Sequence, residues 1–363
     1  MSTSFGRCGQ QQVWGEVMAG LEEFGGWTEI LSSVSHGKDL TTEACTAVMV
    51  DALSGSATDA QVAAFLVGLR LKGETVDELV GLQRGMLAVA VPLHAPDDAI
   101  DIVGVGGSAS RRTHALNVST MAAFVAAGAG ATVCKHGNRK ASSTSGSFDL
   151  LEALGVPVDQ EPATVERQIA THGLGFVFAR TFHPSMKQVA GVRAELGIPT
   201  VFNILGPLSN PARVRRQVIG VSDWSLARPV AETLVATGSE RFMVVHGHGG
   251  LDELSTTGAS QVLAFVEGRL TESVVEPAEL GVACDDPEGL VGGTAETNAR
   301  IAAAVLSGEA GPVRDIVVLN AASGLVVAGL VDGLADGIAL ANASLDNGAA
   351  QAKLDALRQS AAE

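Results

Sequence analysis

The hydrophobic pattern divides the chain into a helical part and a part in which strands alternate with helices. Two capping-box signatures, at Thr58 and Thr75, each precede apolar residues spaced three and four apart, which is typical of amphipathic helices. No strand pattern interrupts this part, so residues 27–97 are predicted to form a small all-helical domain. Residues 1–26 carry little pattern and are interpreted as a leader.

Beyond this part the period of the pattern changes. Short apolar strands alternate with helices, which predicts parallel βαβ units whose loops gather at the carboxyl ends of the strands, where ligands bind. The strands are expected at 101–103, 131–134, 174–178, 217–221 and 242–245, and the helices at 121–127, 148–154 and 163–172. The fold class is therefore α/β, with a mostly parallel central sheet in residues 98–182 and 213–363. The helices of residues 295–363 are expected to cover the sheet's other side.

Helices around residues 183–212 are expected to join the helical domain. Residues 183–196 are interpreted as one helix, and residues 200–211 as an extended, proline-interrupted segment that returns the chain to the sheet. Arg193 falls on the same helical stripe as Val189. A buried guanidinium needs an anionic partner, which is either an internal carboxylate such as that of Glu195 or an acidic substrate.

The polar run at residues 135–147 stands between a predicted strand and a predicted helix. A helix N-terminus offers free N–H groups and the positive end of the helix dipole, and this run adds Lys135, Arg139 and four serines. These groups suit a phosphate. A serine-rich connector with a solvated charge pair is the alternative interpretation.

Two adjacent carboxylates, Asp252 and Glu253, follow the strand predicted at 242–245. Adjacent hard oxygen ligands suit a Mg²⁺ ion shared with a substrate phosphate, and a solvated acidic turn is the alternative. His246 and His248 are separated by one residue. We interpret them as part of a glycine-rich loop, because no third soft ligand for a metal is evident.

The composition favours an α/β enzyme. Of 363 residues, 46% are hydrophobic and 43 are glycine, while aromatic residues make up only 4%. This mixture is unlike that of disulfide scaffolds or disordered chains. The four cysteines lie far apart in the sequence, so we interpret them as reduced thiols of a cytoplasmic protein; they are Cys8, Cys45, Cys134 and Cys284.

Charge and hydropathy exclude two classes of partner. The net charge of −16 disfavours general binding to nucleic acid, although a local basic pocket for one phosphorylated metabolite is compatible with it. The sequence contains neither a signal-peptide pattern nor an uninterrupted apolar run of about 18 residues. We therefore expect neither export nor a membrane span.

Four segments resemble the anthranilate phosphoribosyltransferase family of tryptophan biosynthesis. They are GVGG…NVST at 104–120, KHGNRKASSTSGSFDLLEALGV at 135–156, FARTFHPSMKQVAGVRAELGIPTVFNILGPLSNPA at 178–212 and HGHGGLDELS at 246–255. The resemblance extends from about residue 27 to residue 358. KHGNR followed by the serine-rich run and the LEALG helix is its specific part, since the glycines alone would be a weak signal.

The resemblance implies a fold, an activity and a site. The fold is a helical domain joined to a larger α/β domain, with a homodimer built through the helical domain and a site at the interdomain cleft. The activity is transfer of the phosphoribosyl group from phosphoribosyl pyrophosphate to the amine of anthranilate, with Mg²⁺. No covalent nucleophile is expected.

Residue roles carried over from the family fall into three groups. The donor would be held by Gly104, Gly107, Asn117, Ser119, Thr120, Lys135, His136, Gly137, Asn138, Arg139, Ser142, Ser143 and Ser147. The metal ions would be held by Ser119, Asp252 and Glu253. The aromatic acid would meet Gly104, Asn138, Arg193, Gly206 and Pro207.

The chemistry of the residues agrees with this resemblance. Positive charge develops on the sugar while pyrophosphate departs, so the protein mainly orients the amine and neutralises the leaving group. An aromatic amine is already unprotonated near neutral pH and needs no strong general base.

One loop departs from the family pattern Gly-Thr-Gly-Gly-Asp-Gly. Val105 replaces Thr, Ser108 stands for Asp, Ala115 replaces a later Thr, and the loop is about three residues longer. The cationic tract at residues 108–114 is explained either by drift in a flexible loop or by altered donor affinity or a changed substrate.

Three other functions compete with this interpretation. One is a pyrimidine nucleoside phosphorylase, whose architecture and KHG loop are similar; Asn138 and Arg193 favour the transferase. Another is a paralogue that binds nucleic acid or a ligand without catalysis, which the net charge and the retained pair of carboxylates disfavour. The closest is a phosphoribosyltransferase for a different aromatic acid in specialised metabolism, which the altered loop suggests.

Overall fold

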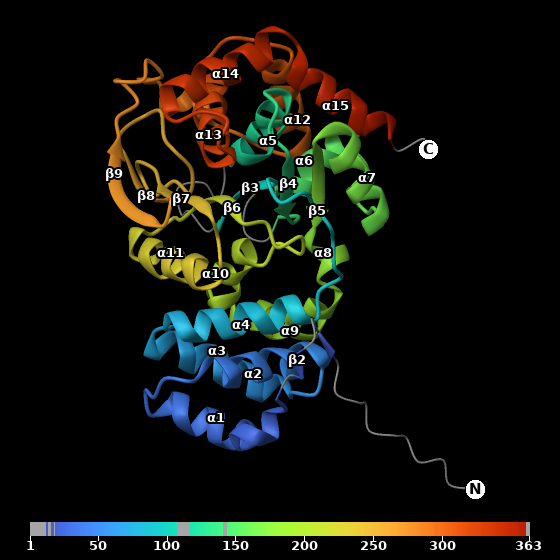
Figure 1. Cartoon of the computed structure of the whole chain (residues 1–363), viewed down its shortest axis with the longest axis vertical. Helices are drawn as coiled ribbons and strands as arrows, with labels where there is room; N and C mark the ends of the chain where they lie inside the picture. Colours follow the sequence, from blue (N-terminus) through green and yellow to red (C-terminus); the bar gives the residue numbers. More distant parts are fainter. Residues whose placement is uncertain (1–11, 14–15, 18, 107–115, 141–143, 361–363) are drawn as a thin grey trace, which may run out of the picture. The chain divides into compact units, whose positions relative to one another are not determined.

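The computed structural model of the chain describes residues 12–13, 16–17, 19–106, 116–140 and 144–360, and it divides into two compact units (Figure 1). Unit 1 comprises Met1–Val89 and Ser185–Val201, and unit 2 comprises Ala90–Pro184 and Phe202–Glu363. The region 183–212, which we expected to join the helical domain, is divided between the two units near residue 201.

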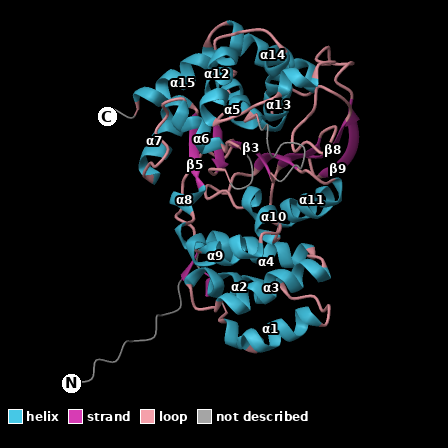
Figure 2. Cartoon of the chain, turned by 180° about the vertical axis from the view of Figure 1, so that it is seen from behind, coloured by secondary structure: helices cyan, strands magenta, loops and turns pink. Residues whose placement is uncertain are grey.

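Unit 1 consists mainly of helices in its described residues (Figure 2). Its elements are β1 (Gln12–Val13), β2 (Glu16–Val17), η1 (Leu21–Phe24), α1 (Gly26–Ser35), α2 (Thr42–Ser54), α3 (Asp59–Lys72), α4 (Val76–Ala88) and α9 (Lys187–Leu196). The antiparallel pair β1–β2 and the helix η1 lie in the segment that we interpreted as an unpatterned leader. Both predicted capping boxes are confirmed, at Thr58 before α3 and at Thr75 before α4.

The fold of residues 183–211 differs from the prediction. The expected helix 183–196 begins as a 3-10 turn, η3 (Pro184–Met186), before it continues as α9. The expectation of an extended segment at 200–211 is wrong, because α10 (Val201–Leu208) is a helix. Its buried residues Val201, Leu205 and Leu208 recur at helical spacing, which outweighs the effect of Pro207 close to the helix end.

Unit 2 is built on one seven-stranded sheet. Its strands are β3 (Ile100–Gly104), β4 (Val133–Gly137), β5 (Leu174–Phe178), β6 (Arg216–Gly220), β7 (Arg241–His246), β8 (Ser260–Val266) and β9 (Arg269–Val275), in the spatial order β5-β4-β3-β6-β7-β8-β9. The five strands from β5 to β7 are parallel, as predicted. The antiparallel hairpin β8–β9 completes the sheet and was not predicted.

Helices surround this sheet. They are α5 (Val118–Gly128), α6 (Ser147–Ala153), α7 (Pro162–His172), α8 (Ala179–Phe182), α10, η4 (Trp224–Leu226), α11 (Ala227–Ala236), η5 (Pro287–Leu290), α12 (Ala295–Leu306), α13 (Pro312–Ala328), α14 (Leu334–Asp346) and α15 (Ala349–Gln359). Within the described ranges, none of the helices has the length and apolar character that crossing a membrane requires.

The helices pack on both faces of the sheet. In Figure 1, α5 and α13 lie on one side of the sheet and α11 lies on the other. Val133 and Phe176 join the core beneath α5, whereas Cys134 and Val177 face the opposite way, toward α7. Among the C-terminal helices that were expected to cover the sheet's other side, α13 packs against α5 on the same face of the sheet. Gly324 of α13 allows this close approach to β3.

One strand is longer than the sequence indicated. β4 was predicted to end at Cys134, but it pairs with β5 as far as Gly137↔Phe178. Lys135 and His136 therefore lie in the sheet rather than in the loop, and both side chains are buried. The polar residue types suggested a loop, and pairing with a distant strand overrides that local signal.

Candidate active site

The order of the strands has a switch point between β3 and β6. From β3 the chain goes to β4 on one side, and it later returns to place β6 on the other side. In parallel sheets, ligands bind outside the carboxyl ends of two strands whose connections diverge in this way. β3 and β6 end in register, with Gly104 beside Gly220.

These two glycines accommodate Asp252. A Cβ atom on Gly220 would overlap the backbone carbonyl of Asp252, and one on Gly104 would overlap its carboxylate. The N–H of Gly106 donates to Oδ2 of Asp252 at 2.9 Å. At a third glycine, Gly247, an added Cβ atom would overlap the carbonyl of Glu253. The strand ends therefore fix the acidic turn through contacts that only glycine permits.

Glu253 lies at the N-terminus of α5. Its Oε1 accepts the backbone N–H of Ser119 at 3.3 Å, and the side chain is nearly buried. The positive end of the helix dipole favours a carboxylate there. Asn320 of α13 fixes the next residue by binding both the N–H and the carbonyl of Leu254 at 2.9 Å.

The three residues predicted to hold metal thus come together from separate parts of the chain. Ser119 touches Glu253, and Asp252 precedes Glu253 in the turn. Carboxylate and hydroxyl oxygens are hard ligands that fit Mg²⁺, which keeps several positions for water and substrate. In the part of the chain that the structure describes, no group of three His, Cys, Asp or Glu side chains is suited to a metal ion.

Lys135 lies buried close to the carboxylates. Its ammonium group donates to the carbonyl of Ile102 in β3. Burial lowers the pKa of Lys135, and the charges of Asp101, Glu253 and Asp252 act in the opposite direction. Burial thus disfavours the charged form of Lys135, and the neighbouring carboxylates favour it.

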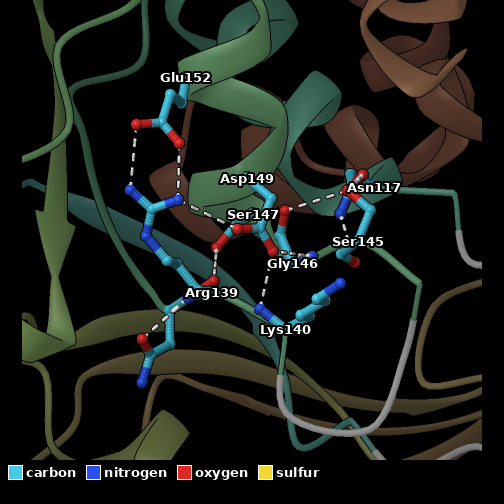
Figure 3. A network of polar contacts seen from close by, with 9 residues as sticks. Asn117, Arg139, Lys140, Ser145, Gly146, Ser147, Asp149 and Glu152 are labelled. Carbon is cyan, nitrogen blue, oxygen red and sulfur yellow. Dashed lines mark hydrogen bonds and ion pairs between the residues drawn. The ribbon is translucent and has the colours of Figure 1, made fainter. Parts of the chain in front are cut away.

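The described part of the serine-rich loop folds back onto α6 (Figure 3). The Arg139 guanidinium pairs with Glu152 at 2.6 Å and Asp149 at 3.3 Å, and it lies 5.8 Å from the ring centre of Phe178. Asp149 also accepts the backbone N–H of Lys140 at 2.8 Å. In this arrangement Arg139 fixes the loop to its own helix.

Gly137, Asn138 and Ser147 lie together where the loop begins and ends. The hydroxyl of Ser147 donates to the carbonyl of Asn138 at 3.0 Å, and a Cβ atom on Gly137 would overlap that hydroxyl. The side-chain carbonyl of Asn138 accepts the N–H of Arg139 at 2.8 Å. The KHGNR motif and the start of α6 thus form one tightly packed turn.

Asn117 connects this loop to α12. Its side-chain carbonyl accepts the hydroxyl of Ser145 at 3.1 Å and the amide of Asn298 at 2.9 Å (Figure 3 labels Asn117 and Ser145). Its own amide donates to the carbonyl of Ser145 at 3.3 Å. Sequence reasoning missed Asn298, because nothing in its neighbourhood marks it as distinct from other helix residues. Thr120, one turn into α5, is buried.

The residues expected to meet the aromatic acid fall in both units. Gly206 and Pro207 belong to α10 in unit 2, and Arg193 belongs to α9 in unit 1. The ring of His136 is hydrogen-bonded to the backbone of Gly206, so the KHGNR motif and α10 are in contact. Burial lowers the pKa of Arg193.

Two buried imidazoles lie beside α10. The rings of His136 and His183 are 5.3 Å apart, and Nε2 of His183 donates to the carbonyl of Ser209 at 2.9 Å. Burial lowers the pKa of His183 to about 4 and lowers that of His136 well below its usual range. Both rings are therefore neutral at physiological pH.

Some of the predicted site lies outside the described residues. This applies to Gly107, Ser142 and Ser143, and to the cationic tract at 108–114 that departs from the family pattern.

Comparison with known proteins identifies both units. Residues 96–351 match the family described as "Glycosyl transferase family, a/b domain", and residues 28–90 match "Glycosyl transferase family, helical bundle domain". The chain is 47% identical over 328 residues to an anthranilate phosphoribosyltransferase from Azorhizobium caulinodans, covering 90% of this chain and 94% of that protein. It is 48% identical over 335 residues to one from Arthrobacter, covering 91% and 94%.

Solved structures agree with the sequence comparison. The crystal structure of the enzyme from Thermus thermophilus is similar with a TM-score of 0.86 and 41% identity, covering 91% of this chain and 98% of that one. The enzyme from Saccharomyces cerevisiae in complex with PRPP and Mg is similar with a TM-score of 0.82 and 29% identity, covering 92% and 97%. The matches extend over both units, and the chain belongs to the anthranilate phosphoribosyltransferase family.

Proposed function

We propose that this protein transfers the phosphoribosyl group of phosphoribosyl pyrophosphate to the amine of anthranilate, releasing pyrophosphate, as a step of tryptophan biosynthesis in the cytoplasm. The observation that carries the proposal is the meeting of Asp252, Glu253 and Ser119 at the ends of β3 and β6. Relatives of this chain bear the name of this activity, and a yeast relative was solved with PRPP and Mg.

Ser119, Asp252 and Glu253 would hold the magnesium. The ligands are all oxygen atoms, which supports this assignment, because Mg²⁺ prefers oxygen ligands. The neighbouring N-terminus of α5 would favour the phosphate oxygens that phosphoribosyl pyrophosphate adds. A bound magnesium ion would supply positive charge that stabilises the departing pyrophosphate.

The chain's own residues would orient the two substrates. As the C1–O bond to pyrophosphate breaks, a bond forms between C1 and the amine nitrogen, and the nitrogen then loses a proton to solvent. Because positive charge develops on the sugar during this step, positioning and electrostatic stabilisation contribute most of the rate enhancement. No side chain has to act as a nucleophile, and the weakly basic amine needs no strong base.

The donor would be held by residues of unit 2. Gly104 ends β3, Lys135 lies within β4 and Ser119 lies in the first turn of α5, while Asn138 and Ser147 form the turn before α6. The remaining members of the proposed set are Gly107, Asn117, Thr120, His136, Gly137, Arg139, Ser142 and Ser143. Arg139 would act by folding the loop onto α6, since its guanidinium pairs with Glu152 and Asp149.

The acceptor would be recognised by its carboxylate and its ring. Arg193 would pair with the carboxylate, because a guanidinium matches a carboxylate with two parallel hydrogen bonds. Gly104, Asn138, Gly206 and Pro207 would lie along the ring. The enzyme from Saccharomyces cerevisiae was also solved with 4-fluoroanthranilate, at a TM-score of 0.81 and 27% identity.

Loss of the two carboxylates should abolish turnover. The unmodified protein should consume anthranilate, followed by its fluorescence, only when phosphoribosyl pyrophosphate and Mg²⁺ are both present. Asp252→Asn combined with Glu253→Gln should lower kcat/KM by about 10³-fold or more, because the leaving group loses several kcal/mol of charge stabilisation.

The matched control for this experiment is Asp285→Asn with Glu288→Gln, which removes the same charge from exposed positions. Unchanged activity in the Asp252/Glu253 variant would remove the metal assignment. Failure of the unmodified protein with anthranilate, but turnover with a substituted benzoate, would favour the paralogue with a different acceptor.

Gly220→Ala should impair the site without touching either carboxylate. The new methyl group overlaps the backbone of Asp252, so the acidic turn must shift, and a displacement of about 1 Å can cost about 100-fold in rate. We expect a higher Mg²⁺ concentration at half-maximal activity. Gly333→Ala is the control, since no atom lies within 4 Å of its added Cβ. Equal Mg²⁺ dependence in both variants would contradict the proposed positioning.

Arg193→Ala should weaken acceptor binding selectively. Loss of a charged hydrogen-bond pair predicts that KM for anthranilate rises about 10- to 100-fold, with a much smaller change for phosphoribosyl pyrophosphate. Arg193→Lys should recover only part of the loss, because an ammonium lacks the planar fork. Arg228→Ala, at an exposed ion pair with Glu232, is the control. An equal rise in both KM values would count against the assigned role.

The proposed oligomer is a homodimer built through unit 1. The side chains of Leu71 and Ile198 in this unit are 83% and 44% exposed to solvent. Exposed apolar side chains of this kind are often buried in an interface with another protein chain, which supports the proposal. Sedimentation equilibrium should give twice the chain mass of 37.0 kDa, and a mass equal to one chain would overturn it.

A further inference from the structure

The backbone pairing between β3 and β4 is shorter than the pairing of either strand with its other neighbour. β3 pairs with β6 along its whole length, from Ile100↔Arg216 to Gly104↔Gly220. β4 pairs with β5 from Val133↔Leu174 to Gly137↔Phe178. Between β3 and β4, both of which are fully described, the register has the single pair Ile100↔Val133. Backbone groups on the facing edges therefore need other partners toward the carboxyl ends of these strands.

Side chains supply those partners. Oδ1 of Asp101 accepts the backbone N–H of His136 at 3.2 Å, and the ammonium of Lys135 donates to the carbonyl of Ile102. Asn210, which follows α10, donates one amide group to both Oδ2 of Asp101 and the carbonyl of Cys134, each at 2.9 Å. Asp101 thus binds β4 directly and also through Asn210.

These contacts are deeply buried. Asp101 is 0% exposed, and Lys135 and Asn210 are each 2% exposed. Burial raises the pKa of Asp101 to about 6, while the charge of Lys135 and the hydrogen bonds from Asn210 and His136 oppose that rise. Apolar side chains at such positions would often be as stable or more stable, so these buried polar side chains are better explained by the geometry that their hydrogen bonds impose.

These contacts lie within three residues of the carboxyl ends of β3 and β4, where the proposed donor site begins. Three residues after Asp101, β3 ends at Gly104, which contacts Asp252. One residue after His136, β4 ends at Gly137, which begins the turn with Asn138 and Ser147. The orientation of the Asn210 side-chain amide is fixed, because its carbonyl accepts the N–H of Ala212 at 3.0 Å.

We propose that Asp101 and Asn210 are positioning residues that replace the β3–β4 ladder and hold the carboxyl ends of these strands at the spacing that a sugar diphosphate requires. The inference rests on the proposed function, because it concerns the same donor site. Neither residue touches the donor; each acts through the backbone of β4.

Exchanging the two side chains tests the inference. Asp101→Asn places an amide group opposite that of Asn210, and Asn210→Asp places a carboxylate opposite Asp101 and the carbonyl of Cys134. Each single variant should weaken calorimetric binding of phosphoribosyl pyrophosphate with Mg²⁺ by about 10- to 100-fold. The double variant restores a donor facing an acceptor between positions 101 and 210 but leaves a carboxylate facing the carbonyl of Cys134, so it should bind the donor more tightly than Asn210→Asp while recovering only part of the loss. In turnover, KM for the donor should rise more than KM for anthranilate.

A merely structural role gives a different result. The control Gln168→Glu changes another buried amide, that of Gln168 on α7, which donates to the hydroxyl of Ser360 at 2.7 Å. This variant should lower the stability of the protein without selectively weakening the binding of phosphoribosyl pyrophosphate. Asn210→Ser removes the bridge without adding charge, and its donor affinity decides the question if the charged variants do not fold. Donor affinity unchanged in every folded variant, or a double variant that binds the donor no more tightly than Asn210→Asp, would overturn the inference.

Failure of the proposed function can be distinguished from failure of this inference. If the proposed function is wrong, the unmodified protein does not turn over anthranilate. Failure of this inference appears only in the difference between variants and the unmodified protein in binding the donor.

Discussion

The close approach of Asp252 to the ends of β3 and β6 is the constraint on which the site depends. Gly104 and Gly220 are neighbours in the sheet, and a side chain on Gly220 would occupy the space of the Asp252 backbone. Because the turn fits into this space, Glu253 reaches the N-terminus of α5. The space that these glycines leave for a backbone therefore decides which polar groups come together: two carboxylates, the N-terminus of α5 and the side chain of Lys135 lie near these strand ends.

The charged residues near the carboxyl ends of the strands act in two ways that residue type alone does not distinguish. Lys135 is buried and reaches the backbone of β3, where the low dielectric strengthens its effect on nearby carboxylates. Arg139 stays near solvent and pairs with acids of the following helix. Surface pairs of this kind contribute little stability, so the main effect of Arg139 is on the conformation of the loop.

Local signals predicted the elements in which pattern and packing agree. The capping boxes at Thr58 and Thr75 begin helices, and β5 lies where the sequence placed it. Predictions failed where a distant partner decides. β4 continues through Lys135 because β5 lies beside it, and α10 forms despite Pro207 because its apolar side is buried. The hairpin β8–β9 went unrecognised because β9 is a largely exposed edge strand.

The sequence by itself determined the class of fold, the resemblance to a phosphoribosyltransferase family and the carboxylate pair, because these depend on short contiguous patterns. Only the tertiary structure revealed the supporting residues: Gly220 under Asp252, Asn298 behind Asn117, and Asn210 between β3 and β4. Each of these acts on residues at least 32 positions away in the sequence. Their role comes from which strands and helices become neighbours, and no local pattern of residue types encodes that arrangement.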